Sequence, residues 1–186
     1  MKVRTPFLLM ILFVAGMAFT GCVKQYSSKN MPKNTVFYNS FEFPQDTINW
    51  YWAKESKFTS DTPPGGGKKA LRILGNLATP AASFLSQRIK NGGYFTIQCW
   101  GKMVDIGGYI ELATITNHEK KDAIHVSVLE EEWHLVSTAD TLYCPPNSNL
   151  MLSIQAGLLM DGTILVDMLQ IKKVKRAPKA ALHARR

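Results

Sequence analysis

The stretch Tyr94-Phe95-Thr96-Ile97-Gln98-Cys99-Trp100-Gly101-Lys102-Met103 decides the fold class of this chain. Its odd-numbered positions hold Phe, Ile, Cys, Gly and Met, and its even-numbered positions hold Tyr, Thr, Gln, Trp and Lys. Because successive side chains of a β-strand point to opposite faces, this alternation predicts a strand with one buried and one solvated side. A sheet built from such strands needs a second layer to cover its apolar side.

Strand-like segments continue along most of the chain on both sides of this stretch. The pattern predicts strands at residues 35–43, 70–74, 83–89, 94–104, 109–117, 124–128, 134–137, 149–157 and 163–174. Gly, Pro, Asn and Asp fill the breaks between them, and no segment keeps a helical period. We therefore expect an all-β fold, an antiparallel β-sandwich, because each sheet has to bury one face against another.

The first 22 residues have the composition of a secretory leader. Lys2 and Arg4 precede an uncharged apolar run, 7–19, which is shorter than the about 20 apolar residues that span a bilayer. The leader ends on Phe-Thr-Gly-Cys at 19–22, which resembles a bacterial lipobox with Phe at the position where Leu is usual. The resemblance implies a signal peptide at 1–21 and a lipidated Cys22 as the new N-terminus. An ordinary cleaved leader with a chance cysteine is the alternative.

Basic residues concentrate outside the predicted domain. All 14 carboxylates lie within 34–174, so the net charge of +8 comes from the flanking segments. We expect a lipidated tether at 22–33 and a disordered basic tail at 175–186. Because the domain itself is not basic, we expect no nucleic-acid binding. Val23 follows the anchor cysteine, and the absence of Asp at that position favours the outer membrane within the cell envelope.

Two cysteines remain once Cys22 is acylated. After export, Cys99 and Cys144 would meet an oxidising compartment, in which a pair of thiols can form a disulfide. Two buried free thiols are the alternative, because Cys99 lies in an apolar strand. Neither has a second cysteine at metal-ligand spacing, so we expect no zinc site.

An ordered series of short motifs resembles the galactose-binding-like jelly rolls. The motifs are Asn-Ser-Phe-Glu-Phe at 39–43, Trp50 with Trp52, Gly-Lys-Lys-Ala-Leu-Arg-Ile at 67–73, Ser-Gln at 86–87, the stretch 94–102 and Thr-Ile-Leu-Val-Asp at 163–167. Within that superfamily they are most similar to the carbohydrate-binding modules associated with cellulases and xylanases. The similarity covers 34–174 and implies a jelly-roll β-sandwich that binds a glycan without catalysis.

The same resemblance implies a structural calcium ion near the junction of the first and last strands. Glu42 and Asp167 match the acidic positions, and the glycine-rich segment before Lys69 and Ala70 would offer backbone carbonyls. Calcium takes about six to eight oxygen ligands of these kinds. Such modules commonly end on two adjacent acids, whereas Met168 occupies the second position here. The alternative is that the two acids cap strand ends or pair with lysines.

Aromatic, amide and acidic side chains on the predicted strands form the candidate glycan site. They are Trp50, Trp52, Gln98, Trp100, Tyr109 and Glu111. We expect Trp100 to be the strongest candidate, because it projects from the polar side of its strand. We expect Tyr109 and Glu111, on the next strand, to line the same sheet, and one of the two tryptophans at 50 and 52 to fill the core.

The motifs that would indicate an enzyme are incomplete. Residues 65–69 lack the first Gly and the Ser or Thr of a phosphate loop, and the three glutamates at 130–132 fall in a predicted turn that faces water. A glycan-active enzyme would need two carboxylates that face each other, for example Asp105 and Glu111. We therefore expect a lipid-anchored, non-catalytic glycan-binding protein. The alternative is an envelope structural or protein-interaction lipoprotein in which the aromatic residues form the core and no sugar binds.

Overall fold

A computed structural model describes residues 31, 33–43, 46, 49–52, 56–75, 82–157 and 161–175. All of them belong to one compact unit, Met31–Arg186. The predicted signal peptide, the anchor Cys22 and most of the tether and basic tail lie outside the described residues. Within the described residues, no helix has the length and apolar character needed to cross a bilayer.

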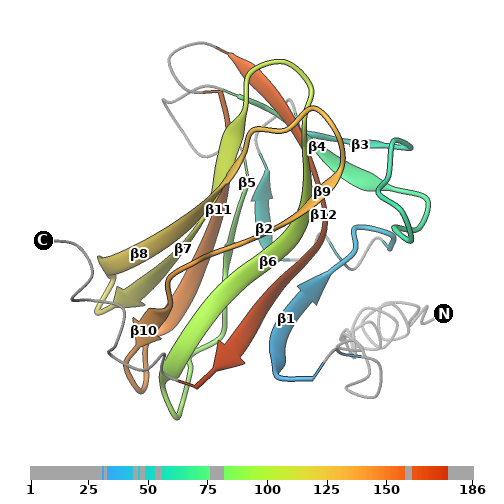
Figure 1. Cartoon of the computed structure of the whole chain (residues 1–186). Coiled ribbons are helices and arrows are strands. Elements are labelled where there is room, and N and C mark those ends of the chain that lie inside the picture. The colour runs from blue at the N-terminus through green and yellow to red at the C-terminus, as the bar shows by residue number, and fades with distance from the viewer. Residues whose placement is uncertain are drawn as a thin grey trace, which may run out of the picture. The chain divides into compact units, whose positions relative to one another are not determined.

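Strands make up nearly all regular structure in the described part of the chain (Figure 1). They are β1 (Thr35–Asn39), β2 (Trp50–Trp52), β3 (Lys57–Thr59), β4 (Ala70–Gly75), β5 (Ala82–Leu85), β6 (Gly93–Met103), β7 (Gly108–Thr116), β8 (Glu119–Val128), β9 (His134–Ser137), β10 (Leu142–Cys144), β11 (Asn149–Ala156) and β12 (Gly162–Val174).

The strands form two antiparallel sheets, which confirms the predicted β-sandwich. One sheet has seven strands in the order β10-β6-β12-β4-β3, with β1 paired to β12 and β9 paired to β6. The other has five strands in the order β2-β5-β11-β7-β8. In Figure 1 the seven-stranded sheet faces the viewer, and β5, β11 and β7 of the other sheet pass behind it. We call the side of each sheet that is turned away from its partner the outer face.

The core between the sheets follows from the alternation in the sequence. On β6, Phe95, Ile97 and Cys99 are fully buried, whereas the even-numbered residues between them are half-buried. Gly101 continues the inner side, and a Cβ built there would lie 2.9 Å from Val128 of the opposite sheet. The two layers therefore meet too closely at this point for any side chain.

A β-bulge in β12 changes which of its residues face the core. Asp167 pairs with Trp100 and Gln170 pairs with Gln98, so β12 carries one extra residue between these pairs. Met168 lies at the bulge with a φ of 48°, in the left-handed region. Before the bulge β12 pairs with β4, and after it β12 pairs with β1 along the same edge. Neither β4 nor β1 pairs with Asp167 and Met168 on this edge, so the strand ladder is interrupted at these two residues.

Of the two alternatives for the cysteines, the structure shows two buried free thiols and no disulfide. Cys99 and Cys144 are both free, and both are fully buried. Cys144 pairs with Gly93, six positions before Cys99 on the same strand, which corresponds to about 20 Å along β6. The Cα atoms of a disulfide lie about 4.4–6.8 Å apart, so these two residues are too distant to bond. Burial raises the pKa of both thiols, which keeps them protonated and unreactive.

Candidate functional site

A buried carboxylate lies at the β-bulge of β12. The side chain of Asp167 is on the outer face of the seven-stranded sheet, on the same side as Trp100, yet it is 0% exposed. Its Oδ1 accepts a hydrogen bond of 2.6 Å from the Met168 N–H, while its Oδ2 is buried without a partner. Burial, together with the nearby charge of Glu42, raises the pKa of Asp167 to about 7, although the hydrogen bond from the Met168 N–H acts to lower it. A buried oxygen without a partner costs stability unless another group satisfies it.

The loop between β3 and β4 covers this carboxylate. A Cβ built on Gly66 would lie 2.6 Å from Asp167 Oδ2, and a Cβ on Gly67 would lie 2.2 Å from Glu42 Oε1. The two acids therefore lie against the dipeptide Gly66-Gly67. A side chain at either position would collide with a carboxylate oxygen, so both positions require glycine. Glu42 Oε1 also accepts hydrogen bonds of 2.7 Å from Lys68 N–H and 2.8 Å from Lys69 N–H.

Glu42 and Asp167 lie near each other at the bulge, and the backbone groups that contact Glu42 differ from those predicted. The sequence led us to expect carbonyls from the segment before Lys69, but the groups that contact Glu42 there are backbone N–H groups. No cluster of three or more His, Cys, Asp or Glu occurs in the part of the chain that the structure describes. An ion here would have the carboxylates of Glu42 and Asp167 and would need its other oxygens from backbone or water.

Asp46 is a further acid near Glu42, and no motif in the sequence indicated it. Its side chain is 7% exposed, and its Oδ2 accepts a hydrogen bond of 3.1 Å from the Phe43 N–H. Burial raises the pKa of Asp46, and the charge of Glu42 adds to this increase. The Asn39 side chain donates to the Asp46 carbonyl at 2.7 Å, so this residue anchors the segment after β1.

Trp50 is a core residue and not a sugar platform. It is 8% exposed, and its ring lies 5.6 Å from Phe84, 6.0 Å from Phe41 and 6.2 Å from Phe37 between ring centroids. The expectation that one of the two tryptophans fills the core is therefore met by Trp50, and its assignment to a glycan site is wrong. Trp52 ends β2, and its side chain lies outside the described residues.

Gln98 and Trp100 lie on the outer face of the seven-stranded sheet. Trp100 is half-buried between its cross-strand neighbours Asp167 and Leu135, the latter 49% exposed. Gln98 Oε1 accepts hydrogen bonds from the side chains of Gln170 and Lys172. The polar side of β6 that the alternation predicted is confirmed. The Gln98 side-chain oxygen is already hydrogen-bonded to side chains of the neighbouring strand β12.

Tyr109 and Glu111 lie on the outer face of the other sheet. Their strand, β7, pairs with β11 and β8 in the five-stranded sheet, whereas Trp100 belongs to the seven-stranded sheet. The prediction that these two residues line the same sheet as Trp100 is wrong. The four-residue β6–β7 connection, 104–107, crosses from one layer to the other, so the predicted site is divided between opposite sides of the sandwich.

A continuous row of polar and aromatic residues crosses the outer face of the five-stranded sheet. Direct cross-strand pairs join, from β2 to β8, Tyr51, Ser83, Ser153, Glu111 and His125. Tyr51 is 65% exposed, whereas Ser153 in the middle of the row is 5% exposed. We call these five residues the cross-sheet row.

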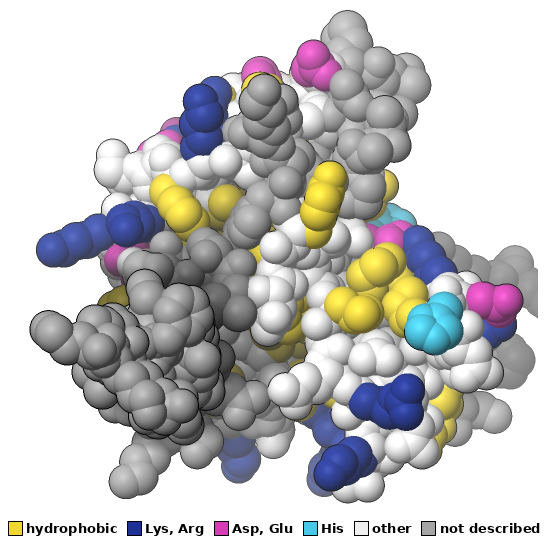
Figure 2. All heavy atoms as spheres, turned by 180° about the vertical axis from the view of Figure 1, so that it is seen from behind, with side chains coloured by type: hydrophobic (Ala, Val, Ile, Leu, Met, Phe, Trp, Pro, Cys, Tyr) yellow, Lys and Arg dark blue, Asp and Glu magenta, His cyan; other side chains and the backbone are white. Residues whose placement is uncertain are grey.

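A second line of contacts runs beside the cross-sheet row. The Tyr109 hydroxyl donates a hydrogen bond of 2.8 Å to Gln155 Oε1, and the Tyr109 ring lies edge-on to His125 at 6.3 Å. Lys120 forms an ion pair of 2.7 Å with Glu111. Figure 2, which views the molecule from this side, shows hydrophobic side chains gathered beside a histidine, with lysines or arginines around them. Tyr51, Gln155 and His125 were missed in the sequence because nothing local indicates which strands adjoin β7.

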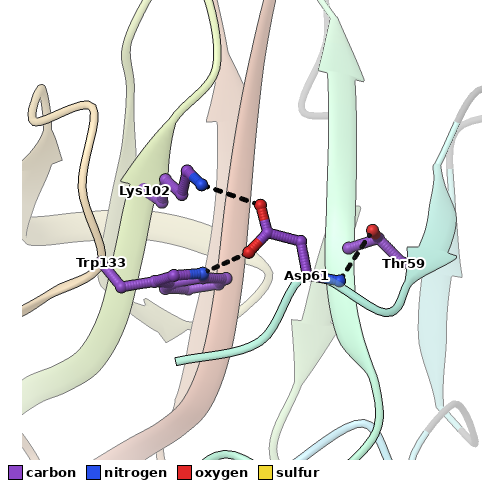
Figure 3. A network of polar contacts seen from close by, with 4 residues as sticks. All are labelled: Thr59, Asp61, Lys102 and Trp133. Atoms are coloured by element: carbon purple, nitrogen blue, oxygen red, sulfur yellow. Dashed lines mark hydrogen bonds and ion pairs between the residues drawn. The ribbon is translucent and has the colours of Figure 1, made fainter. Parts of the chain in front are cut away.

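A polar network fixes the loop that covers Asp167 to the rest of the seven-stranded sheet (Figure 3). Asp61, in that loop, accepts hydrogen bonds of 2.8 Å from Lys102 Nζ on β6 and of 2.8 Å from the indole N–H of Trp133. The hydrogen bond from Lys102 lowers the pKa of Asp61 and raises that of Lys102, and the bond from Trp133 lowers that of Asp61 further. The network therefore joins three segments that are distant in sequence.

The carboxylates considered for catalysis do not act as a facing pair. Asp105 Oδ1 accepts hydrogen bonds of 2.5 Å from the Thr163 N–H and the Ile106 N–H, in the turn after β6. Glu111 lies on the outer face of the five-stranded sheet and is paired with Lys120. The glutamates at 130–132 are exposed, as predicted.

Comparison with known proteins supports the fold and not a closer relationship. No protein-family model matches the chain, and no curated protein is significantly similar in sequence. Among solved structures, the CBM22-1 xylan-binding domain of Paenibacillus barcinonensis Xyn10C aligns with a TM-score of 0.53 and 17% identity over 77% of this chain and 96% of that one. The C-terminal family 22 carbohydrate-binding module of Clostridium thermocellum Xyn10B aligns with a TM-score of 0.52 and 11% identity over 78% and 97%. A structure titled as the xylan-binding domain from CBM 22 gives a TM-score of 0.51 and 11% identity over 80% and 100%.

These domains have the galactose-binding-like jelly-roll fold that the sequence motifs resembled. Their alignment covers them almost completely, so the likeness extends to the whole sandwich. The described chain is therefore an antiparallel β-sandwich with the jelly-roll fold of the carbohydrate-binding modules.

Proposed function

We propose that this chain is a lipid-anchored, non-catalytic glycan-binding protein of the cell envelope, whose ligand lies across the outer face of the five-stranded sheet. The observation that supports this proposal most strongly is the cross-sheet row together with Tyr109 and Gln155. The solved structures with the same fold are named as xylan-binding domains, so a β-linked plant polysaccharide such as xylan is the first ligand to test.

The chemistry of this face suits a sugar. Carbohydrate rings have apolar faces that stack on aromatic side chains, and their hydroxyls bind amides and carboxylates. Tyr51 and Tyr109 supply aromatic surface, while Gln155 and Glu111 supply polar atoms between them. Because Tyr109 is hydrogen-bonded to Gln155 and Glu111 is paired with Lys120, these side chains are held in place before a ligand arrives.

Binding to insoluble and soluble polysaccharides tests this proposal directly. The unlipidated chain from Val23 to Arg186 would be run in affinity gels that contain xylan, cellulose derivatives, galactans or peptidoglycan fragments. Retardation by one polymer is expected, and a Tyr109→Ala, Glu111→Ala variant should lose it. The matched control is Gln98→Ala, Trp100→Ala, which removes a polar and an aromatic side chain from the opposite face. Loss of retardation only in the control would move the site to the seven-stranded sheet, and no retardation by any polymer would contradict glycan binding.

A protein-interaction role is the second candidate, and the outer face of the seven-stranded sheet favours it. There Leu135 is 49% exposed beside the half-buried Trp100. Under this alternative, crosslinking in intact cells would capture a specific envelope protein through this face, and no polysaccharide would bind.

The proposed membrane anchor is the acylated Cys22. Its support is the leader sequence alone, since these residues lie outside the described part of the chain. Mass spectrometry of the mature protein should find acyl chains on the N-terminal cysteine, and Cys22→Ser should release the protein from membranes. Fractionation of the envelope would test the outer-membrane location.

We also propose that calcium binds between Glu42 and Asp167. The unpartnered Asp167 Oδ2 and the side-chain-free cover of Gly66 and Gly67 suit a cation, which would stabilise both carboxylates in their charged form. An ion bound only to the native state stabilises it by RT ln(1 + [L]/Kd), about 2.7 kcal/mol at a hundredfold excess over Kd. Melting at neutral pH should therefore occur at lower temperature with a chelator, and Asp167→Asn should remove that difference. A curve that does not shift with the chelator would contradict the ion.

A further inference from the structure

The charged side chains of the described domain are segregated along the direction of its strands. The end at which the described chain starts and finishes has three acidic residues, Glu119, Asp122 and Asp140, and eight basic ones, Lys33, Arg88, Lys90, Lys120, Lys121, Lys172, Lys173 and Lys175. We call this the basic end. The opposite end has nine acidic residues, Glu42, Asp46, Asp61, Asp105, Glu130, Glu131, Glu132, Asp161 and Asp167, and five basic ones, Lys57, Lys68, Lys69, Arg72 and Lys102. Glu111 lies between the two ends of β7.

Strand register places the basic residues together, although they come from distant parts of the sequence. Lys172 pairs with Thr35, and the Lys173 N–H donates a hydrogen bond of 2.8 Å to the Asn34 carbonyl. In the other sheet Lys120 pairs with Ile115, which also pairs with Asn149.

The loop after β5 completes the basic end. Its residue Ile89 forms a bridge with Ser148, next to Asn149, so the exposed Arg88 and Lys90 flank this contact. Lys173 Nζ donates to the Gly92 carbonyl at 2.6 Å, which joins the same loop to β12. In Figure 2 the lower end shows lysines or arginines without a visible acidic side chain, while acidic side chains lie above it among further lysines or arginines.

Exposed aromatic surface accompanies these charges. Tyr143 is 47% exposed, and its ring lies 5.1 Å from that of Tyr94, whose strand position pairs with Val174 at the end of β12. Tyrosine is enriched where proteins meet the polar region of a bilayer, and lysine and arginine are attracted to its anionic lipids.

We propose that the basic end is a docking surface for the anionic phospholipid headgroups of the membrane to which the chain is anchored. The chain enters the domain at Lys33, eleven residues after Cys22, and eleven residues span at most about 40 Å whatever their conformation. This inference rests on the proposed lipid anchor, which would hold the domain at a membrane. The residues that would contact the headgroups belong to the described domain.

Docking at the basic end would also set the orientation of the domain. The acidic end, with Glu42 and Asp167, would point away from an anionic surface that repels it. Both outer faces would then run outward from the membrane, so the cross-sheet row would be accessible to a polymer.

Vesicle binding of the unlipidated chain from Val23 to Arg186 tests the docking surface without the anchor. This segment contains the whole compact unit that starts at Met31 and so includes every described strand. Cosedimentation would compare vesicles of phosphatidylcholine with vesicles that contain about 30 mol % phosphatidylglycerol. Binding is expected only to the anionic vesicles and should disappear at about 1 M salt, where the Debye length is about 3 Å.

A matched pair of charge-reversal variants locates the contact. Each basic residue near an anionic surface contributes roughly a fivefold increase in partitioning, so Arg88→Glu, Lys90→Glu should weaken vesicle binding about 25-fold or more. Arg72→Glu, Lys57→Glu makes the same change in net charge at exposed positions of β4 and β3 and should stay within about twofold of the parent. Thermal melting confirms that both variants are folded.

Three outcomes would overturn the proposal. The first is that both charge-reversal variants weaken vesicle binding equally, which would indicate an effect of net charge alone. The second is that the parent chain binds neutral and anionic vesicles equally. The third is that the chain binds a soluble polyanion such as heparin but no vesicle. None of these results depends on polysaccharide retention or on acylation of Cys22. A failure here is therefore distinct from a failure of the proposed glycan binding or of the anchor.

Discussion

The two outer faces of this sandwich differ in what covers them. On the seven-stranded sheet the β3–β4 loop lies over β12 and buries Asp167 completely. On the five-stranded sheet the cross-sheet row runs from one edge to the other and ends on Tyr51, which is 65% exposed. The covered face stores a charge that is costly to bury, whereas the five-stranded face, which we call the open face, exposes Tyr51 at one edge and keeps Ser153 and Gln155 only 5% and 6% exposed. Changes on the covered face should therefore alter stability, and changes on the open face should alter binding.

The largest effect is expected from Asp167 when no cation is present. Because burial raises its pKa from 3.8 to about 7, the folded state holds a proton that the unfolded state has lost between these values. Stability should then be full below about pH 4 and fall as pH rises toward 7, by an upper limit of about 4 kcal/mol. Asp167→Asn should remove this slope and be more stable than the parent at pH 8 in a chelator. Melting curves at several pH values measure it, and an unchanged slope in the variant would show that Asp167 stays ionised.

A methyl group at Gly66 should have the next largest effect. The new Cβ would lie 2.6 Å from the Pro63 ring and from Asp167 Oδ2, so the covering loop has to move. We expect Gly66→Ala to cost about 2–3 kcal/mol, in the range of overpacked sites. Gly65→Asn is the control from the same turn, because nothing lies within 4 Å of its Cβ position and Asn tolerates the left-handed φ of 76° there. Denaturant unfolding that gives equal losses for both variants would mean that the cover is not closely packed.

Removal of the Asp61 network should have a smaller effect. Asp61 is 44% exposed and Lys102 is 24% exposed, so solvent screens their ion pair, while the hydrogen bond from the Trp133 indole remains. We expect Asp61→Ala to cost about 1 kcal/mol. The lowered pKa of Asp61 means that this contribution is present above its ordinary pKa of 3.8 and is lost as pH falls through the lower folded value. A double-mutant cycle with Lys102→Met isolates the pair, and a coupling of zero would contradict the network.

The smallest change in stability is expected on the open face. Tyr109→Phe removes only the hydroxyl that donates to Gln155, on a half-buried ring, so the free energy of unfolding should change by less than about 1 kcal/mol. Retention by the polysaccharide identified in affinity gels should nevertheless fall, since Gln155 loses the contact that orients it. A stable variant with unchanged retention would place the ligand elsewhere.

Strands with strong local signals were predicted well from the sequence. All nine predicted strands are present, and His134–Ser137 has the predicted bounds. The three strands that were missed, β2, β3 and β10, have three residues each, and too few alternations fit in that length to give a pattern. β8 starts at Glu119 instead of residue 124, because its first residues are charged and exposed on both faces.

The candidate site was predicted only in part, for reasons of chain topology. Glu42 and Asp167 come together as the family resemblance implied, although 124 intervening residues separate them and no local feature marks the bulge at Met168. Trp50 and Trp52 share a face of an extended segment, but the sequence does not show which face meets Phe37 and Phe84. Tyr109 follows Trp100 along the chain and yet belongs to the opposite sheet.

Sequence alone determined the strand character of this chain, its sandwich class and the charge of each segment, because alternation and composition are local properties. Tertiary structure decided which strands share a sheet, which aromatic side chains are buried, why Cys99 and Cys144 stay apart and how the charges separate to opposite ends. The physical reason is that alternation assigns a side chain to a face of its own strand only. Which solvent, loop or neighbouring sheet covers that face depends on hydrogen-bonded pairs between residues far apart in the sequence.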